Sequence, residues 1–355
     1  LTGGEPLVRE DIFDLSSHAS KKGMMVVFGT NATTLDDKTA KEMIKTGVAG
    51  VGISIDSASP KYHDLFRGMD GAWEKAMDGI ESCKRHGIEF QIQTTVTTAN
   101  YNEIQDIIEL SHKMGSRVFN LFFMVCTGRG QDITDISAEQ YEETLRLLLD
   151  IQGKYKNMMV TARCAPHFKR LAYEKDPESP ITKVAGYTGG GCLAAFHYCR
   201  ITPEGDVTPC PYIPTAVGNV KKVSFVDIWN KADFFQNMRR PKLTGRCGDC
   251  EYEFICGGCR ARAYAAKNDI MAEDPWCKYE PRKIGYKIKP QKKEDTEEIG
   301  WSTEAEERLN KVPYFLKGMV KKAVEKHARE KGLKEVTVAL MEEVRKKSGR
   351  PSFSQ

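Results

Sequence analysis

The sequence predicts an α/β fold: a parallel sheet or barrel first, then a loop-rich metal-binding domain and a small helical domain. Three observations predict it. Short apolar runs alternate with amphipathic stretches up to about residue 130, eight of the eleven cysteines lie between Cys192 and Cys277, and a new helical pattern follows a charged connector. The 355 residues suffice for two or three domains.

Four strands are expected in the first part, because four short runs are rich in β-branched or aromatic residues: Met24–Phe28, Val51–Ile55, Phe90–Val96 and Val118–Met124. Each follows a helical stretch that closes on a glycine, the residue that best adopts the left-handed backbone after a helix: Gly23, Gly47, Gly87 and Gly115. The continuous apolar character of two runs favours parallel strands that are buried on both faces.

The charge pattern favours neither nucleic acid nor a membrane as a partner. The formal charge of +4 arises from 53 basic and 49 acidic residues with no long block of one sign. No run approaches the roughly 18 apolar residues that span a bilayer, and the start lacks the features of a signal peptide. We therefore predict a cytoplasmic protein.

The chain divides into five predicted parts. Residues 1–155 form the strand–helix part, which ends in a helix that Ser137 and Gln140 cap and that runs to about Lys154. The periodicity then fades, so 156–191 is interpreted as an irregular connecting segment. Residues 192–285 are the cysteine-rich domain, 286–300 a linker, and 301–350 a domain of helices.

The helices of the last domain are predicted from residues that typically begin or end a helix. Thr303 and Glu306 form a capping-box pattern, Pro313 is placed to start the next helix, Gly332 ends it, and Thr337 caps the last one. Apolar residues at helical spacing are expected to form this domain's own core: Trp301, Leu309, Phe315, Met319 and Leu340.

The cysteine spacing indicates metal ligation. The spacing is Cys-x6-Cys-x10-Cys, then Cys-x2-Cys-x5-Cys-x2-Cys and a last cysteine: Cys192, Cys199, Cys210, Cys247, Cys250, Cys256, Cys259 and Cys277. Eight thiolates can hold two four-iron clusters, because soft sulfur suits iron. Structural zinc remains an alternative, and disulfides are disfavoured in a chain without an export signal.

This spacing, with Gly205 before Cys210, resembles the SPASM domain, which carries auxiliary clusters behind radical S-adenosylmethionine (SAM) barrels. The resemblance implies an inner [4Fe-4S] cluster on Cys192, Cys199, Cys210 and Cys259. It implies an outer one on Cys247, Cys250, Cys256 and Cys277. The family usually has three residues before the fourth cysteine of the second run, whereas two separate Cys256 from Cys259, which leaves the pairing open.

The first part resembles a radical SAM barrel in several motifs. Thr2-Gly3-Gly4-Glu5-Pro6 is similar to the segment that receives the amino group of SAM, Asn31 and Ser54-Ile55-Asp56 follow strands, and Arg67 lies in a loop whose arginine pairs the SAM carboxylate. The resemblance implies SAM-binding roles for Gly3, Gly4, Glu5, Pro6, Asn31, Ser54, Asp56 and Arg67. It implies a partial (β/α)6 barrel that lacks its first strand.

Purely structural roles remain possible for several of these residues. Asp56-Ser57 equally suits the cap of the following turn, and Arg67 a solvated surface position. Gln93, Thr95 and Asn100 match the family more loosely. Packing is favoured over substrate contact for three cysteines: Cys83, Cys126 and Cys164.

The catalytic cluster has no ligands here. The family binds a catalytic [4Fe-4S] cluster through Cys-x3-Cys-x2-Cys, and none of the eleven cysteines has that spacing. Because the chain opens on Leu1 and the second-strand motif, we expect the cluster to be held by a preceding segment. The chain alone is then expected to be inactive.

Two phrases resemble one branch of the family, Tyr198–Gly205 and Cys256–Tyr264. This branch removes acetate or carboxyl groups from sirohaem-derived tetrapyrroles in haem and haem d1 biosynthesis. Trp301–Lys347 resembles the end of a light-independent protochlorophyllide reductase subunit. The resemblance implies an iron tetrapyrrole as substrate and a reductant such as ferredoxin or flavodoxin.

Other functions and roles remain open. The alternatives are a maturase that modifies a peptide or protein, and a noncatalytic electron-transfer module. Arg260 and Arg262 either pair substrate carboxylates or form the solvated face of a helix, with the second slightly favoured. His197 and Tyr198 are expected to pack rather than to donate a proton or bind haem iron.

Overall fold

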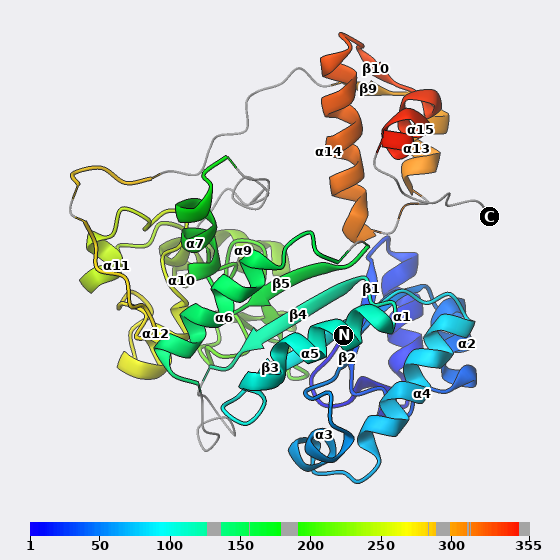
Figure 1. Ribbon diagram of the computed structural model, residues 1–355, viewed down its shortest axis with the longest axis horizontal. Coiled ribbons are helices and arrows are strands. Elements are labelled where there is room, and N and C mark those ends of the chain that lie inside the picture. Colours follow the sequence, from blue (N-terminus) through cyan, green and yellow to red (C-terminus); the bar gives the residue numbers. More distant parts are fainter. Residues whose placement is uncertain are drawn as a thin grey trace.

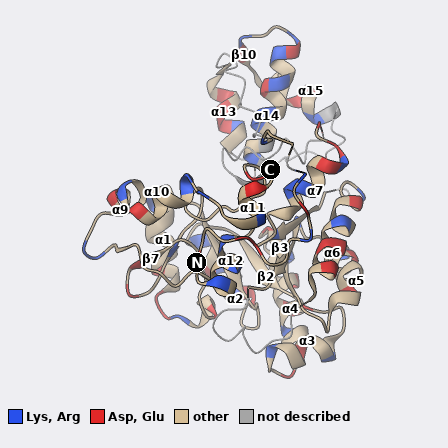
Figure 2. Ribbon diagram, turned by 90° about the vertical axis from the view of Figure 1, so that its left-hand side faces the viewer, with Lys and Arg blue, Asp and Glu red and all other residues tan. Residues whose placement is uncertain are grey.

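The structure is a computed structural model that describes residues 1–125, 136–155, 157–178, 191–282, 284–288, 299–310, 312 and 314–347 (Figure 1). The predictions for Cys126 and for Pro313 fall outside these residues. Within them, no helix is long and apolar enough to cross a membrane. Figure 2 shows basic and acidic residues intermingled along the helices, in keeping with the scattered charges of the sequence.

A parallel sheet of five strands forms the centre of the first part, in the order of the sequence: β1 (Val26–Thr30), β2 (Val48–Ser54), β3 (Phe90–Val96), β4 (Val118–Phe123) and β5 (Met159–Arg163). The first four confirm the predicted strands within a few residues, and all pairs are parallel. The fifth was not expected. The prediction of an irregular segment over 156–191 is wrong for β5 and for the helix after it.

Helices come before, between and after these strands. η1 (Pro6–Val8) and α1 (Ile12–Lys21) precede β1, and α7 (His167–Lys175) follows β5. The connections between the strands contain α2 (Asp37–Lys45), α3 (Pro60–Arg67), α4 (Ala72–Arg85), η2 (Tyr101–Glu103), α5 (Ile104–Lys113) and α6 (Ala138–Asp150). The predicted capping box of Ser137 and Gln140 is present. The four expected glycines, Gly23, Gly47, Gly87 and Gly115, all have φ between 67° and 86°. That left-handed backbone lets the chain turn from helix to strand.

The two faces of the sheet differ in character. One face packs against the helices in a buried core, to which the middle strands contribute Ile53, Ile92, Phe119 and Leu121. On the other face the strand register aligns a polar row: Ser54, Gln93, Asn120 and Thr161. Because parallel strands with this register point equivalent side chains the same way, the sheet has an apolar side towards the helices and a polar side opposite.

The cysteine-rich part has its own small core and little regular structure. It contains a three-stranded antiparallel sheet, β6 (Arg200–Ile201), β7 (Asp206–Thr208) and β8 (Gly218–Asn219), and four helices, α9 (Phe225–Lys231), α10 (Asp233–Arg239), α11 (Gly245–Asp249) and α12 (Arg260–Lys267). Val207, Ile213 and Phe235 are fully buried in its core. Val125, just after β4, packs into the same core, so this part contacts the carboxyl ends of the barrel strands.

The last part also has a separate core, built from α13 (Thr303–Asn310), α14 (Tyr314–Glu330) and α15 (Val338–Lys347). Two short parallel strands, β9 (Gly300–Trp301) and β10 (Glu335–Val336), correct the expectation of an all-α domain. The first cap is also corrected, because the Ser302 hydroxyl, rather than Thr303, accepts from Ala305 N at 3.3 Å. Thr337 caps α15 as predicted.

Candidate active site and metal centres

Glu5 holds the Gly-Gly-Glu-Pro segment in place through hydrogen bonds of its side chain. Its carboxylate accepts hydrogen bonds from the Thr30 hydroxyl at 2.5 Å, Asn31 N at 2.7 Å and Leu7 N at 3.1 Å. These bonds join the segment to the end of β1 and cap η1. The ammonium of Leu1 donates to Val27 O at 2.7 Å, so the chain enters alongside β1.

The two glycines of this segment expose their backbone. A Cβ atom placed on Gly3 or Gly4 would meet nothing within 4 Å, and Gly3 has a φ of 141° that side chains rarely allow. A ligand can therefore approach the backbone carbonyl groups closely. Pro6 lies buried behind them at the start of η1.

Asp56 is the most highly connected of the predicted SAM-site residues. It is fully buried, forms an ion pair with Arg67, and accepts from Thr95 N at 2.9 Å through its carboxylate. Its carbonyl accepts from Asn100 Nδ2 at 2.8 Å. Ser57, not Asp56, caps the following turn, since its hydroxyl accepts from Ser59 N at 2.9 Å.

His63 completes this group from helix α3. Its Nδ1 accepts from Asp56 N at 3.2 Å, which places the proton of the neutral ring on Nε2. Burial lowers the pKa of His63, so the ring stays neutral near pH 7. The structure therefore brings together Asp56 and Arg67 from the predicted set, with Arg67 still 29% exposed.

Asn31 and Ser54 end neighbouring strands at the same edge of the sheet. The side-chain oxygen of Asn31 accepts from the backbone and hydroxyl of Thr33, at 2.9 and 2.8 Å. Ser54 is half-buried and pairs in register with Gln93. Carboxyl ends of parallel strands are where ligand sites of such sheets form.

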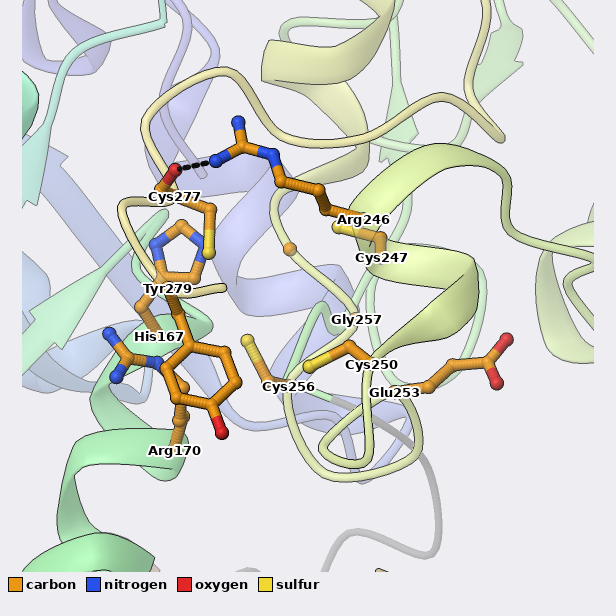
Figure 3. A pocket seen from close by; sticks show the side chains of 11 residues that line it. His167, Arg170, Arg246, Cys247, Cys250, Glu253, Cys256, Gly257, Cys277 and Tyr279 are labelled. Atoms are coloured by element: carbon orange, nitrogen blue, oxygen red, sulfur yellow. Dashed lines mark hydrogen bonds between the residues drawn. The ribbon is translucent and has the colours of Figure 1, made fainter. Parts of the chain in front are cut away.

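One cavity gathers the four cysteines predicted for the outer cluster. Cys247, Cys250, Cys256 and Cys277 line one small space, and Figure 3 shows their sulfur atoms pointing into it. Arg246 supports one wall by donating to Cys277 O at 2.8 Å. Burial raises the pKa of the Cys250 and Cys277 thiols to about 11, so binding a metal there must release protons.

The buried ring of His167 lies beside this cavity, with its Nε2 3.7 Å from Asp274 Oδ2. His167 also lines the cavity, and its buried Nε2 has no hydrogen-bond partner within the described part of the chain. Its Nδ1 bonds the Tyr141 hydroxyl at 3.0 Å. The four thiols around this one space suit an iron–sulfur cluster.

The inner group lies where the barrel meets the cysteine-rich part. Cys192, Cys199, Cys210 and Cys259 all belong to the second core or pack against it. Burial raises the pKa of Cys210 to about 12 and that of Cys259 to about 11. Across the ranges that the structure describes, no three Cys, His, Asp or Glu side chains are arranged to hold a single metal ion. Thiolates at the corners of a cluster lie farther apart than the ligands of one ion.

The chain matches known families in three places. Residues 1–111 match the radical SAM superfamily, 192–251 the SPASM iron–sulfur cluster-binding domain, and 301–345 the 57 kD subunit of proto-chlorophyllide reductase. An AdoMet-dependent heme synthase of Methanosarcina barkeri is 39% identical over 80% of this chain and 82% of its own. The chain belongs to the radical SAM family.

Two further relatives and one solved structure are similar to this chain, the structure in its fold. An AdoMet-dependent heme synthase of Nitratidesulfovibrio vulgaris is 40% identical over 80% of this chain and 79% of its own. A pre-heme d1 synthase of Dinoroseobacter shibae is 32% identical over 78% and 73%. The Streptococcus suis SuiB structure superposes with a TM-score of 0.63 at 17% identity, covering 78% of this chain and 66% of its own. The radical SAM and SPASM domains imply SAM and iron–sulfur clusters as cofactors.

Both expectations for Arg260 and Arg262 are wrong in this radical SAM chain. The two side chains are 6% and 4% exposed, so they neither form a solvated face nor reach a substrate. Arg260 donates to the carbonyls of Ile270 and Ala272, at 2.8 and 2.7 Å. Arg262 pairs with Asp274. Both arginines hold the cysteine-rich part together.

Three further predictions concern side chains beside the sites. His197 and Tyr198 are exposed, which contradicts the expected packing role. Cys83 is fully buried in the barrel core, as predicted for a packing cysteine. Cys164 is partly buried and packs against both the barrel core and the second core, beside the inner thiols.

Arg163 is not among the predicted site residues, because β5 is not apparent from the sequence. The available signal was the alternation of Met159-Val160-Thr161-Ala162-Arg163, which places the first, third and fifth residues on one face. The structure puts Arg163 at the carboxyl end of β5, next to Cys164. A radical SAM site is built at such strand ends, so this arginine lies at the candidate active site.

Proposed function

We propose that this chain acts in haem biosynthesis as a radical SAM enzyme that removes carboxyl groups from an iron tetrapyrrole. The observation that carries this proposal is the 39–40% identity to AdoMet-dependent heme synthases over four fifths of the chain. The thiol groups at the carboxyl ends of the strands support it, since the second half of the reaction requires an electron acceptor near the substrate.

The relatives favour decarboxylation over loss of acetate. The heme synthases are more similar to this chain than the pre-heme d1 synthase at 32% or an Fe-coproporphyrin III synthase at 27% identity. In the proposed reaction a propionate, –CH2–CH2–COO⁻, loses one hydrogen atom, then carbon dioxide and one electron, and leaves a vinyl group. The hydrogen passes to the 5′-deoxyadenosyl radical, and the electron passes to an oxidised acceptor such as an auxiliary cluster.

The described residues suit SAM at one edge of the sheet. When bound, SAM and a catalytic [4Fe-4S] cluster supply the radical. We assign SAM binding to the motif residues: Gly3, Gly4, Glu5, Pro6, Asn31, Ser54, Asp56 and Arg67. The open carbonyl groups of the glycines suit an ammonium, and Arg67, which Asp56 holds in place, suits a carboxylate.

We further propose two auxiliary [4Fe-4S] clusters, an inner one on Cys192, Cys199, Cys210 and Cys259, and an outer one on Cys247, Cys250, Cys256 and Cys277. We assign the catalytic cluster to a segment outside residues 1–355, because these residues contain no Cys-x3-Cys-x2-Cys. An electron donor such as ferredoxin or flavodoxin in the cytoplasm would complete the system.

The separate cores support three domains in this enzyme. We propose a barrel over 1–175 that includes β5 and α7, a SPASM domain over 192–285, and a small C-terminal domain over 301–350 after the linker 286–300. The buried residues of the last domain support a purely internal core.

The test of this function uses the anaerobically reconstituted holoenzyme with SAM, a low-potential reductant and iron-coproporphyrin III. We expect each reacted side chain to lose the mass of one carbon dioxide and two hydrogens. SAM cleavage to 5′-deoxyadenosine with no change in tetrapyrrole mass would contradict the proposal. Modification of a peptide under the same conditions would favour a maturase instead.

A further inference from the structure

We infer that Arg163 binds a carboxylate group of the substrate and fixes the reacting side chain between the SAM site and the inner thiols. The inference rests on the proposed function for the identity of the substrate, an iron tetrapyrrole with propionate side chains. Three observations support the inference. Arg163 lies at the carboxyl end of β5, it forms no ion pair with a described residue, and hydrogen bonds to neighbouring side chains orient it.

The position of Arg163 follows from the strand register. Arg163 pairs with Phe122, which pairs with Thr95, so all three lie on the face opposite the helices, one row beyond Asn120. The core face of β5 carries Val160 and Ala162 instead. In Figure 1, β5 lies beside β4 at the edge of the sheet. Arg163 therefore lies on the polar face, at the end where the SAM motifs also lie.

Arg163 is the only charged residue on this face of the five described strands. The other side chains there are neutral or absent: Val27, Gly29, Gly50, Gly52, Ser54, Gln91, Gln93, Thr95, Val118, Asn120, Phe122, Met159 and Thr161. No ion pair of Arg163 is recorded with any residue that the structure describes, and its side chain is exposed. An anionic group entering this face thus meets a single cation that is not neutralised.

A chain of hydrogen bonds orients the guanidinium. Arg163 Nε donates to Asn120 Oδ1 at 3.1 Å, and Thr161 donates to the same oxygen at 2.5 Å. Asn120 in turn donates to Gln91 Oε1 at 2.7 Å. Because Nε is occupied, the two terminal nitrogen atoms remain to bind a planar carboxylate, and less side-chain freedom is lost on binding.

Cys164, which follows Arg163 in the chain, lies beside the cysteines proposed for the inner cluster. Cys164 has a left-handed backbone with a φ of 56°, unusual for cysteine, and packs against the core that contains Cys210 and Cys259. On the other side, the Thr2 side chain lies over Gly29 and the Gln93 amide lies over Gly52, so polar groups line the face towards β1 and β2. A carboxylate on Arg163 therefore places its side chain between the hydrogen-abstracting end of the site and an electron acceptor.

The test compares Arg163→Gln, Arg163→Lys and Arg146→Gln in the holoenzyme. Arg146 is the matched control, since it is an exposed arginine on α6 that pairs only with Glu142. Binding of iron-coproporphyrin III is followed by absorbance and binding of SAM by equilibrium dialysis, both without reductant. We expect about 10- to 100-fold weaker tetrapyrrole binding for Arg163→Gln, a smaller loss for Arg163→Lys, and unchanged binding of SAM.

A second arm uses the same tetrapyrrole with its propionates converted to methyl esters. The wild-type enzyme should prefer the free acid, whereas Arg163→Gln should bind acid and ester about equally. Equal loss of SAM binding would overturn the inference, because it would assign Arg163 to the SAM carboxylate. Unchanged acid binding in Arg163→Gln would overturn it as well.

The outcome separates this inference from the proposed function. If wild-type enzyme with full iron content binds no iron tetrapyrrole, the proposed function fails, and the assignment of Arg163 fails with it. If the wild type binds and converts the tetrapyrrole while Arg163→Gln does so equally well, only the role of Arg163 fails. Iron content and far-ultraviolet circular dichroism of each variant report on correct folding.

Discussion

Arg262 and Asp274 form a bidentate ion pair in the interior, with both nitrogen–oxygen distances at 3.0 Å and Asp274 fully buried. Asp274 also accepts from Cys259 N at 2.7 Å, and the guanidinium lies over Trp276 and Tyr141. Since Tyr141 belongs to barrel helix α6, the pair joins the barrel to the cysteine-rich part at Cys259, which we propose as a ligand of the inner cluster.

Removing one partner of this pair should destabilise the protein strongly. Asp274→Asn leaves Arg262 buried without a counter-charge, which typically costs about 3–5 kcal/mol of unfolding free energy. Denaturant unfolding measures the loss. Asp70→Asn, at an exposed residue with no recorded partner, is the control and should change stability by less than about 0.5 kcal/mol. Equal stabilities of the two variants would contradict the role of the pair.

The pH dependence of stability should include a contribution from His63. Burial lowers the pKa of His63 in the folded state, below the ordinary value of about 6.5 that the unfolded chain has. The unfolded state therefore binds the proton first as the pH falls, so stability should rise with pH below about 6.5 and level off above it. His63→Asn should flatten this slope by up to about 1 kcal/mol per pH unit, whereas exposed His18→Asn should not.

Arg67 should matter for SAM binding and for Asp56. Arg67→Gln leaves the fully buried Asp56 carboxylate without its ion-pair partner and removes the proposed partner of the SAM carboxylate. We expect roughly 10- to 100-fold weaker SAM binding by dialysis. Arg85→Gln, an exposed arginine paired with Asp37, serves as control and should bind SAM normally. Wild-type affinity in Arg67→Gln would refute the assignment.

The cysteine assignment predicts how iron is divided. Anaerobic reconstitution of this chain should give about eight irons, four for each auxiliary cluster. Cys277→Ser should lose about half of them, whereas Cys83→Ala, in the barrel core, should lose none. Zinc in place of iron, without visible absorption, would contradict the assignment of both thiol groups.

Strands were predicted well where a continuous stretch of sequence has a clear pattern of apolar residues. The four predicted strands are long apolar runs closed by glycine turns, and such runs are read within a few residues. Met159–Arg163 is short and alternates, with exposed ends, so it gave too little signal before helix α7. These residues are recognised as a strand only from their pairing with β4 in the structure.

In the candidate site, too, features that are continuous in the sequence were predictable, and contacts between distant residues were not. The SAM motifs and the cysteine spacing were visible because each is continuous in the sequence. The burial of Arg262 was not, because its partner Asp274 lies twelve residues later in a loop and its stacking partner Tyr141 lies 121 residues earlier. A polar helix end with two arginines is ordinarily solvated, and only the tertiary contacts decide otherwise.

The most direct test of the central claim follows the hydrogen atom. Iron-coproporphyrin III deuterated on its propionate carbons is incubated with holoenzyme, SAM and reductant, and the 5′-deoxyadenosine is analysed by mass spectrometry. The account predicts that 5′-deoxyadenosine gains deuterium as vinyl groups and carbon dioxide form. Deuterium-free 5′-deoxyadenosine, formed while the tetrapyrrole keeps all of its carboxyl groups, would contradict it.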